Sequence, residues 1–191
     1  MGTRVVIAED ETIIRLDLKE ILEEEGYEVV GETGRGDEVV DLVKATQPDL
    51  AILDIRMPGM DGLTAAREIT SERRAAVLIL TAFSQRNLIE EARDAGALAY
   101  LVKPFQTNEL IPAIEVALGR FAEMKALEQE NKNLEEQLET RRWVDRAKGM
   151  LMDRHGMSEA DAFRFIQQAA MRERQTMRVV AKRIVDGELN P

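Results

Sequence analysis

Residues 50–62, LAILDIRMPGMDG, decide the fold of this chain, because a short apolar run ends there in an aspartate and a glycine-rich turn. A strand that is apolar on both faces is buried on both faces, which is typical of parallel sheets covered by helices. Asp54 ends the run, so its carboxylate is expected at the carboxyl edge of such a sheet. Open α/β sheets place their functional sites at this edge, which makes Asp54 a candidate functional residue.

Four similar apolar runs, RVVIA, YEVVG, AVLIL and LAYLV, occur elsewhere in the first 105 residues, and segments with helical periodicity separate them. Gly26 and Gly96 stand where helices would end. Five strand–helix units in series predict an α/β fold, a doubly wound five-stranded parallel sheet with helices on both faces. The expected helices are residues 13–25, 37–46, 63–72 and 86–95, and a fifth that begins near Thr107.

Polar side chains end four of the five runs. Glu9 and Asp10 end the first and Asp54 ends the third, so three carboxylates should converge. Like charges this close favour a cation, and Mg²⁺ prefers oxygen ligands. Thr81 ends the fourth run and Lys103 the fifth. A hydroxyl, an ammonium group and Mg²⁺ around a nucleophilic carboxylate suit phosphoryl transfer to Asp54.

Residues 1–120 resemble the receiver domain of bacterial two-component response regulators, whose fold is flavodoxin-like. The resemblance rests on Glu9-Asp10, LDIRMPGMDG, LTAF and AYLVKPF. It implies that a partner histidine kinase transfers a phosphoryl group to Asp54. It also implies that Asp10 and Asp54 bind Mg²⁺ directly, that Glu9 assists through water, and that the Arg56 carbonyl completes the ligands. Many receivers have Asp-Asp where this chain has Glu9-Asp10, a departure that can change the affinity for Mg²⁺.

The same resemblance implies roles for the residues that end the fourth and fifth strands. Thr81 and Lys103 would hold the phosphoryl oxygens, and Tyr100 would be the aromatic switch residue. The peptide bond between Lys103 and Pro104 would be cis. Phosphorylation would move Thr81 and rotate Tyr100, which is the usual form of a switch that biases a bistable element.

Residues 121–140 predict a coiled-coil helix that follows the receiver without a flexible linker. Apolar residues recur there at spacings of three and four with Asn131 among them, which is an a/d seam. The seam residues are Met124, Leu127, Asn131, Leu134 and Leu138. We favour a parallel homodimer formed on phosphorylation over the alternative, an amphipathic helix that packs back on its own domain.

Residues 141–191 differ from the rest of the chain in charge. They contain eleven Lys and Arg against seven Asp and Glu, a net charge of +4, whereas the remainder has −14. Their patterns predict a small all-α domain of three helices, residues 141–154, 159–169 and 176–185, with Ser158 as a capping residue. Two modules with different partners are therefore expected.

This C-terminal segment resembles an ANTAR domain, through AKGMLM, GMSEADAF and the flanking Arg141 and Val144-Asp145. The resemblance implies binding to RNA stem-loops in leader transcripts. Bound dimers there would prevent the formation of a terminator hairpin, so that transcription continues, which is transcription antitermination. Arg141, Lys148 and Gly149 match the family pattern and are the expected RNA contacts. Arg178 and Lys182 are added on charge and placement alone. Trp143 is expected in the core rather than stacked on a loop base.

Two other readings of the basic segment stay open: a DNA-binding module, or a module that meets an acidic protein partner. An enzyme with an outside substrate is not expected, because no further catalytic group accompanies the acidic site. The chain has no Cys and one His, which disfavours disulfides and structural zinc. It shows no signal peptide and no apolar run long enough to cross a bilayer, so a cytoplasmic protein without a membrane partner is expected.

Overall fold

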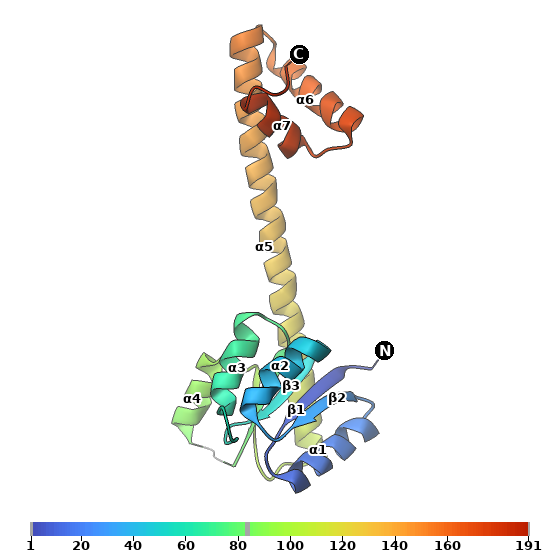
Figure 1. Cartoon of the computed structure of the whole chain (residues 1–191), viewed down its shortest axis with the longest axis vertical. Helices are drawn as coiled ribbons and strands as arrows, with labels where there is room; N and C mark the ends of the chain where they lie inside the picture. Colours follow the sequence, from blue (N-terminus) through green and yellow to red (C-terminus); the bar gives the residue numbers. More distant parts are fainter. Residues whose placement is uncertain (1, 83–84, 191) are drawn as a thin grey trace. The chain divides into compact units, whose positions relative to one another are not determined.

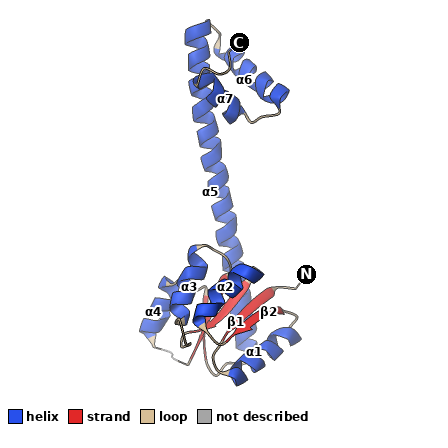
Figure 2. Cartoon of the chain, viewed as in Figure 1, coloured by secondary structure: helices blue, strands red, loops and turns tan. Residues whose placement is uncertain are grey.

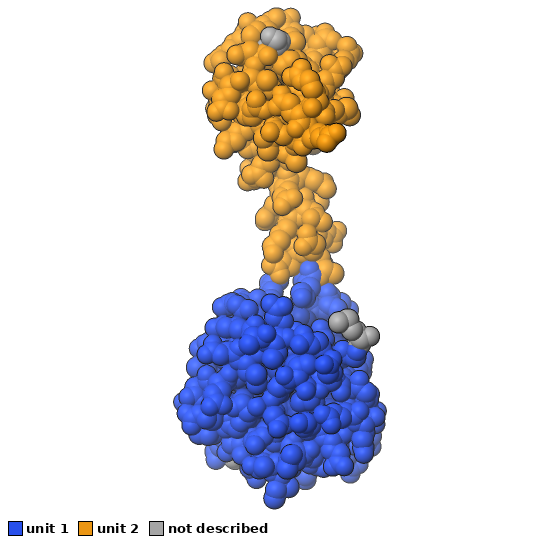
Figure 3. Space-filling view, turned by 45° about the vertical axis from the view of Figure 1, so that its right-hand side comes forward, with its two compact units in different colours: residues 1–125 blue, residues 126–191 orange. Residues whose placement is uncertain are grey.

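The computed structural model of this chain describes residues 2–82 and 85–190. The chain forms two compact units, Met1–Lys125 and Ala126–Pro191, which Figure 3 colours separately. Among the described residues, no helix combines the length and the apolar character that a membrane span requires.

The N-terminal unit is built on a five-stranded parallel sheet with helices on both faces (Figures 1 and 2). The strand order is β2-β1-β3-β4-β5, the order of flavodoxin-like folds, so the predicted fold class is confirmed. The strands are β1 (Arg4–Ala8), β2 (Glu28–Thr33), β3 (Leu50–Asp54), β4 (Ala76–Thr81) and β5 (Ala99–Val102). The helices between them are α1 (Thr12–Glu24), α2 (Gly36–Thr46), α3 (Gly62–Ser71) and α4 (Arg86–Asp94).

The central strand β3 explains why this sheet is parallel and covered on both sides. All five of its residues are buried. Ala51 and Leu53 pack with residues of α2 and α3, whereas Leu50 and Ile52 pack on the other face with residues of α1 and of the helix that follows β5. A strand with two apolar faces thus builds two cores, as its sequence predicts.

The four helices begin and end within one residue of the positions expected from the sequence. Gly26 and Gly96 follow α1 and α4 with φ of +86° and +83°, a conformation that glycine adopts without a steric penalty. Asp61 caps α3, since its side chain accepts a hydrogen bond from the Thr64 amide at 2.9 Å. This cap starts α3 directly after the loop that follows Asp54.

The last element of the N-terminal unit is α5, a single helix from Thr107 to His155 that continues into the C-terminal unit. The helix expected at residues 141–154 is therefore not separate but is the end of α5. Leu127, Leu134 and Leu138 of the expected seam are 60%, 50% and 57% exposed. These leucines belong to the C-terminal unit and lie outside its core.

The C-terminal unit closes a small core with α6 (Glu159–Glu173) and α7 (Met177–Val185) against the end of α5. Ser158 and Thr176 cap these two helices by accepting hydrogen bonds from Asp161 N and Val179 N. Trp143 packs against this core, as predicted. The helix α6 is four residues longer than expected, and it ends at Arg174 in the left-handed conformation, with φ of +53°.

Candidate functional site

Three carboxylates meet at the carboxyl edge of the sheet. Because β1 and β3 are paired neighbours, with Ala8 opposite Leu53, the residues that follow them lie side by side. Glu9, Asp10 and Asp54 each offer a carboxylate oxygen within 4.8 Å of the others. Glu9 and Asp54 are buried, whereas Asp10 is exposed. The sequence therefore predicted this convergence correctly.

Lys103 brings a positive charge into the same pocket from the end of β5. Its Nζ atom lies 2.6 Å from Glu9 Oε2 and 3.3 Å from Asp54 Oδ2, and its side chain is 8% exposed. The backbone amide of Lys103 donates to the Thr81 carbonyl at 2.7 Å, which fixes this residue beside β4. The peptide bond between Lys103 and Pro104 is cis, as expected.

The buried charges shift one another's protonation. Burial raises the pKa of Glu9 and of Asp54, and their contacts with Lys103 counteract this only in part. Burial alone would lower the pKa of Lys103, but its hydrogen bond to Glu9 and the charge of Asp54 outweigh burial and raise that pKa. One lysine faces three acids, so the pocket has room for a further positive charge.

The donor set of this pocket fits Mg²⁺. Carboxylate oxygens are the ligands that this hard cation prefers, and three of them converge here. Asp54 Oδ1 accepts a hydrogen bond from Ile55 N at 2.8 Å, which holds the carboxylate in a fixed orientation. Arg56 lies two residues beyond Asp54 in the loop between β3 and α3, on the same edge of the sheet.

Thr81 and Tyr100, the expected switch residues, are in contact. Thr81 is fully buried at the end of β4, and Tyr100 lies on the neighbouring β5. Burial raises the pKa of Tyr100, and a hydrogen bond between the Thr81 and Tyr100 side chains opposes that rise. A displacement of Thr81 would therefore be felt directly at Tyr100. Phe83, the last residue of the LTAF motif, lies outside the described residues.

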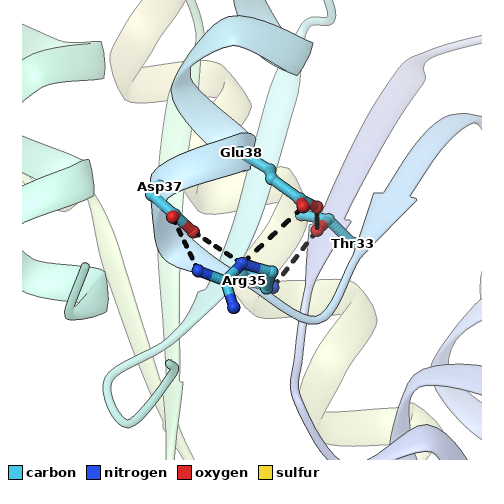
Figure 4. Close-up of polar contacts among 4 residues, drawn as sticks. All are labelled: Thr33, Arg35, Asp37 and Glu38. Atoms are coloured by element: carbon cyan, nitrogen blue, oxygen red, sulfur yellow. Dashed lines mark hydrogen bonds and ion pairs between the residues drawn. The ribbon is translucent and has the colours of Figure 1, made fainter. Parts of the chain in front are cut away.

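A polar cluster where β2 ends and α2 begins was missed from the sequence (Figure 4). Thr33 Oγ1 donates to Glu38 Oε2 at 2.6 Å and accepts from Arg35 N at 3.1 Å. The Arg35 guanidinium donates twice to the Asp37 carboxylate, at 3.0 and 2.7 Å. The GRGDE stretch at residues 34–38 was the available signal, since glycines beside charged residues mark a closely packed loop.

This cluster holds the loop that follows Asp54. Gly36 N donates to the Pro58 carbonyl at 3.1 Å. Gly59 has a φ of +85°, a conformation that favours glycine, and a Cβ atom added there would lie 2.8 Å from Asp37 Oδ2. The loop that follows Asp54 therefore packs at Pro58 and Gly59 against the start of α2.

The residues expected to contact RNA have different environments within the C-terminal unit. Arg141 is exposed, with a side chain 82% accessible, whereas Lys148 is 17% accessible and forms ion pairs with Asp145 at 2.9 Å and Glu159 at 2.8 Å. These contacts raise the pKa of Lys148, the hydrogen bond to Glu159 most of all. Arg141 and Lys148 line the same groove.

The other three expected RNA contacts do not line that groove. An added Cβ at Gly149 would have no atom within 4 Å, so no close approach within the chain requires glycine there. Arg178 pairs with Glu139 at 2.5 Å. Lys182 is exposed on α7. Acidic neighbours therefore compensate three of the five residues, Arg141, Lys148 and Arg178, and only the first two share the groove.

Comparisons with known proteins match the N-terminal and C-terminal parts of the chain to two different families. Residues 5–115 match the family model of the response regulator receiver domain, and residues 132–185 match that of the ANTAR domain. The transcriptional regulatory protein PdtaR of Mycobacterium tuberculosis is 58% identical over 183 residues, which cover 96% of this chain and 89% of PdtaR. The chemotaxis protein CheY of Bacillus subtilis is 38% identical over 120 residues, 62% of this chain and all of CheY.

Solved structures resemble the N-terminal unit. The signal receiver domain of the response regulator NarL from Mycobacterium tuberculosis superposes with a TM-score of 0.59 at 32% identity, covering 62% of this chain and 97% of that chain. A chain of the CheX-CheY-BeF3-Mg²⁺ complex from Borrelia burgdorferi superposes with a TM-score of 0.56 at 26% identity, covering 59% of this chain and 86% of that chain. The chain therefore belongs to the response regulators of two-component systems, with a receiver domain followed by an ANTAR domain.

Proposed function

We propose that this response regulator accepts a phosphoryl group on Asp54 from a histidine kinase and, once phosphorylated, binds RNA stem-loops to cause transcription antitermination. The observation that carries the proposal is the meeting of Glu9, Asp10, Asp54 and Lys103 in one pocket of a chain that also has an ANTAR domain. In this proposal residues 1–120 receive the phosphoryl group, residues 121–140 join two copies, and residues 141–191 bind RNA.

Phosphoryl transfer would use the groups of this pocket. A carboxylate oxygen of Asp54 forms the new bond to phosphorus while the bond between phosphorus and the donor's nitrogen breaks. Lys103, already 3.3 Å from Asp54 Oδ2, neutralises charge on the phosphoryl oxygens, and Thr81 donates a hydrogen bond to one of them. The receiver thus promotes its own phosphorylation but acts on no further substrate.

Mg²⁺ would be held by Asp10, Asp54 and the Arg56 carbonyl, with Glu9 assisting through water. Bound there, it would neutralise charge that develops during transfer. Glu9 would also hold Lys103, at 2.6 Å, in a position to reach the incoming group. The loop cluster of Arg35 and Asp37 would keep Arg56 at the pocket edge.

The switch would follow from the charge that phosphorylation adds. A phosphoryl group brings about two negative charges at neutral pH. Thr81 would turn toward it and release its hydrogen bond to Tyr100, which would then rotate inward. The rotation of Tyr100 would change the surface formed by β5 and the neighbouring helices, and so favour one of two conformations of this unit.

Dimerisation through α5 would be the readout. The seam supports it, because Leu127, Leu134 and Leu138 leave half or more of their surface accessible. Asn131 lies at an a position, where a buried polar pair fixes register and strand number. Two copies would double the number of RNA-binding surfaces.

Arg141, Lys148, Gly149, Arg178 and Lys182 would form the RNA-binding surface. Arg141 and Lys182 are exposed and suit contacts with phosphates. Lys148 and Arg178 would exchange their carboxylate partners for phosphate, or would keep those partners and fix the shape of the surface. A cytoplasmic location, where transcripts and kinase are both available, is part of the proposal.

The test is binding of the full chain to RNA hairpins, with and without beryllofluoride and Mg²⁺, and with the Asp54→Ala variant as the control. Tight binding with beryllofluoride that is lost in the variant is expected. Equal binding in all samples would contradict the gating by phosphorylation. Preference for duplex DNA of the same sequence, or absence of nucleic-acid binding at moderate salt, would contradict the RNA function and favour a DNA or acidic protein partner.

A further inference from the structure

A groove of about 670 Å³ lies in the C-terminal unit between α5 and the two helices that pack against it. Its volume is in the range of sites for small organic groups. The wall on α5 includes Gln137, Arg141, Val144 and Lys148, which recur at spacings of four, three and four. Asn133, Glu136, Thr140 and Asp145 complete the lining on this helix. Phe163 of α6 and Met177 at the start of α7 contribute apolar surface opposite.

Phe163 is a large apolar residue that lines this groove and does not belong to the core of the C-terminal unit. Its neighbour Ala162 and Ile166 are fully buried in the core of this unit, whereas Phe163 is 43% exposed. Its ring therefore contributes to the groove rather than to the packing of α6. An accessible aromatic ring is the surface on which unpaired bases stack in single-stranded nucleic acid complexes.

Polar groups surround this aromatic surface. Gln137 and Thr140 line the groove and can donate or accept hydrogen bonds. Asp145 lines it as an acceptor, and Arg141 contributes a cation whose side chain is 82% exposed. An apolar ring, hydrogen-bonding groups and one accessible cation together match the three parts of a nucleotide: base face, base edge and phosphate.

We propose that this groove binds one unpaired base of an RNA loop, with Phe163 stacked on its face and Arg141 on a neighbouring phosphate. The proposal rests on the RNA-binding function proposed above and adds the site at which a loop base is recognised. Phe163 is not among the RNA contacts expected from the sequence. Lys148, paired with Asp145 and Glu159, holds the wall of the groove in place.

A second copy of the chain is the competing occupant. Arg141 follows the seam residues Leu134 and Leu138 by seven and three positions, so it lies on the seam face of α5, whereas Gln137 is turned from that face by about 100°. Arg141 is cationic where the seam has leucines. Two copies in parallel would place like charges opposite one another there, which disfavours a second copy in the groove.

The experiment uses the full chain with beryllofluoride and Mg²⁺. The probe is the hairpin that binds wild type most tightly from a pool with one constant stem and randomised loops. Each loop nucleotide of that hairpin is then replaced by an abasic one, and binding is measured for wild type and Phe163→Leu. Met171→Leu is the matched control, because Met171 is also on α6, is 70% exposed and does not line the groove.

One loop position is expected at which loss of the base weakens wild-type binding by about tenfold or more, as removal of a stacked base does. Phe163→Leu should weaken binding of the intact hairpin similarly and be insensitive to that abasic position, whereas Met171→Leu should behave as wild type. Circular dichroism should show the same helix content for all three proteins.

Independent losses from the abasic position and from Phe163→Leu would overturn the stacking proposal while the RNA function stands. Unchanged hairpin binding by Phe163→Leu would do the same. A shift of Phe163→Leu from dimer to monomer in sedimentation would assign the groove to a second copy instead. If no hairpin of the pool binds wild type, the RNA function fails and the groove proposal fails with it.

Discussion

Replacement of Gly62 by alanine should destabilise the receiver unit strongly, because the backbone of the phosphoacceptor occupies the space that a side chain would need. A Cβ atom added at Gly62 would lie 2.8 Å from the carbonyl carbon of Asp54 and 3.1 Å from Ile55 Cα, and closer still to the Asp54 carbonyl oxygen. These neighbours are backbone atoms of the end of β3, so no flexible side chain can move aside.

The size of the effect follows from this geometry. Overpacking of a well-packed core costs typically 1–3 kcal/mol, and about 3 kcal/mol is expected here, since the clash is with backbone. Gly119→Ala is the matched control: Gly119 lies in α5 of the same unit, and an added Cβ would meet nothing within 4 Å. That variant should gain up to about 1 kcal/mol from better helix propensity.

Native-state hydrogen exchange of the β3 amides measures the free energy of unfolding of this unit separately from the C-terminal one. We expect the two Gly→Ala variants to change it in opposite directions. The rate of phosphorylation should also fall for Gly62→Ala, because Asp54 is displaced. Equal free energies for Gly62→Ala and wild type would refute the close packing of Gly62 against Asp54.

Further predictions concern the seam, a helix cap and a helical glycine. Leu134→Ala should weaken the dimer about 30-fold in sedimentation experiments, since burying its 50% exposed surface is worth about 1 kcal/mol in each copy; an unchanged dimer would rule out the seam. Asp61→Ala should cost about 1 kcal/mol of stability at neutral pH. Burial raises the pKa of Asp61, but its hydrogen bonds to Thr64 outweigh burial and lower that pKa below the ordinary 3.8. Its contribution is thus complete above the unfolded pKa and is lost as the pH falls through the lower, folded pKa; equal acid unfolding of variant and wild type would contradict this. Gly149→Ala should stabilise the C-terminal unit by up to about 1 kcal/mol and weaken RNA binding, and unchanged RNA binding would remove Gly149 from the proposed surface.

The receiver could be predicted from local sequence because its signals are local. Each strand is a short apolar run, and the side chain that follows the run must lie at the carboxyl edge of the sheet. The convergence of Glu9, Asp10 and Asp54 needs only the neighbouring positions of β1 and β3, which the fold class supplies.

The features missed from the sequence depend on contacts between distant segments. The ion pair of Lys148 with Glu159 arises because α5 and α6 pack together, and no helical pattern along α5 reveals it. In the same way, Arg35 and Asp37 hold the loop after β3 through contacts that a GRGDE stretch suggests only as a tight turn. The prediction that a new helix starts at residue 141 was wrong, since α5 is continuous from Thr107 to His155. The net charge of the chain changes at residue 141, but its helix propensity does not.

The most direct test of the account is to locate the phosphoryl group after the full chain is incubated with a small phosphodonor such as acetyl phosphate. Tandem mass spectrometry should find one hydroxylamine-sensitive acyl phosphate, on Asp54, that requires Mg²⁺ and is absent from Asp54→Asn. Phosphorylation that is unaffected by Asp54→Asn, or a wild-type chain that stays unmodified with Mg²⁺ present, would contradict the assignment of the acidic pocket as the phosphoacceptor site.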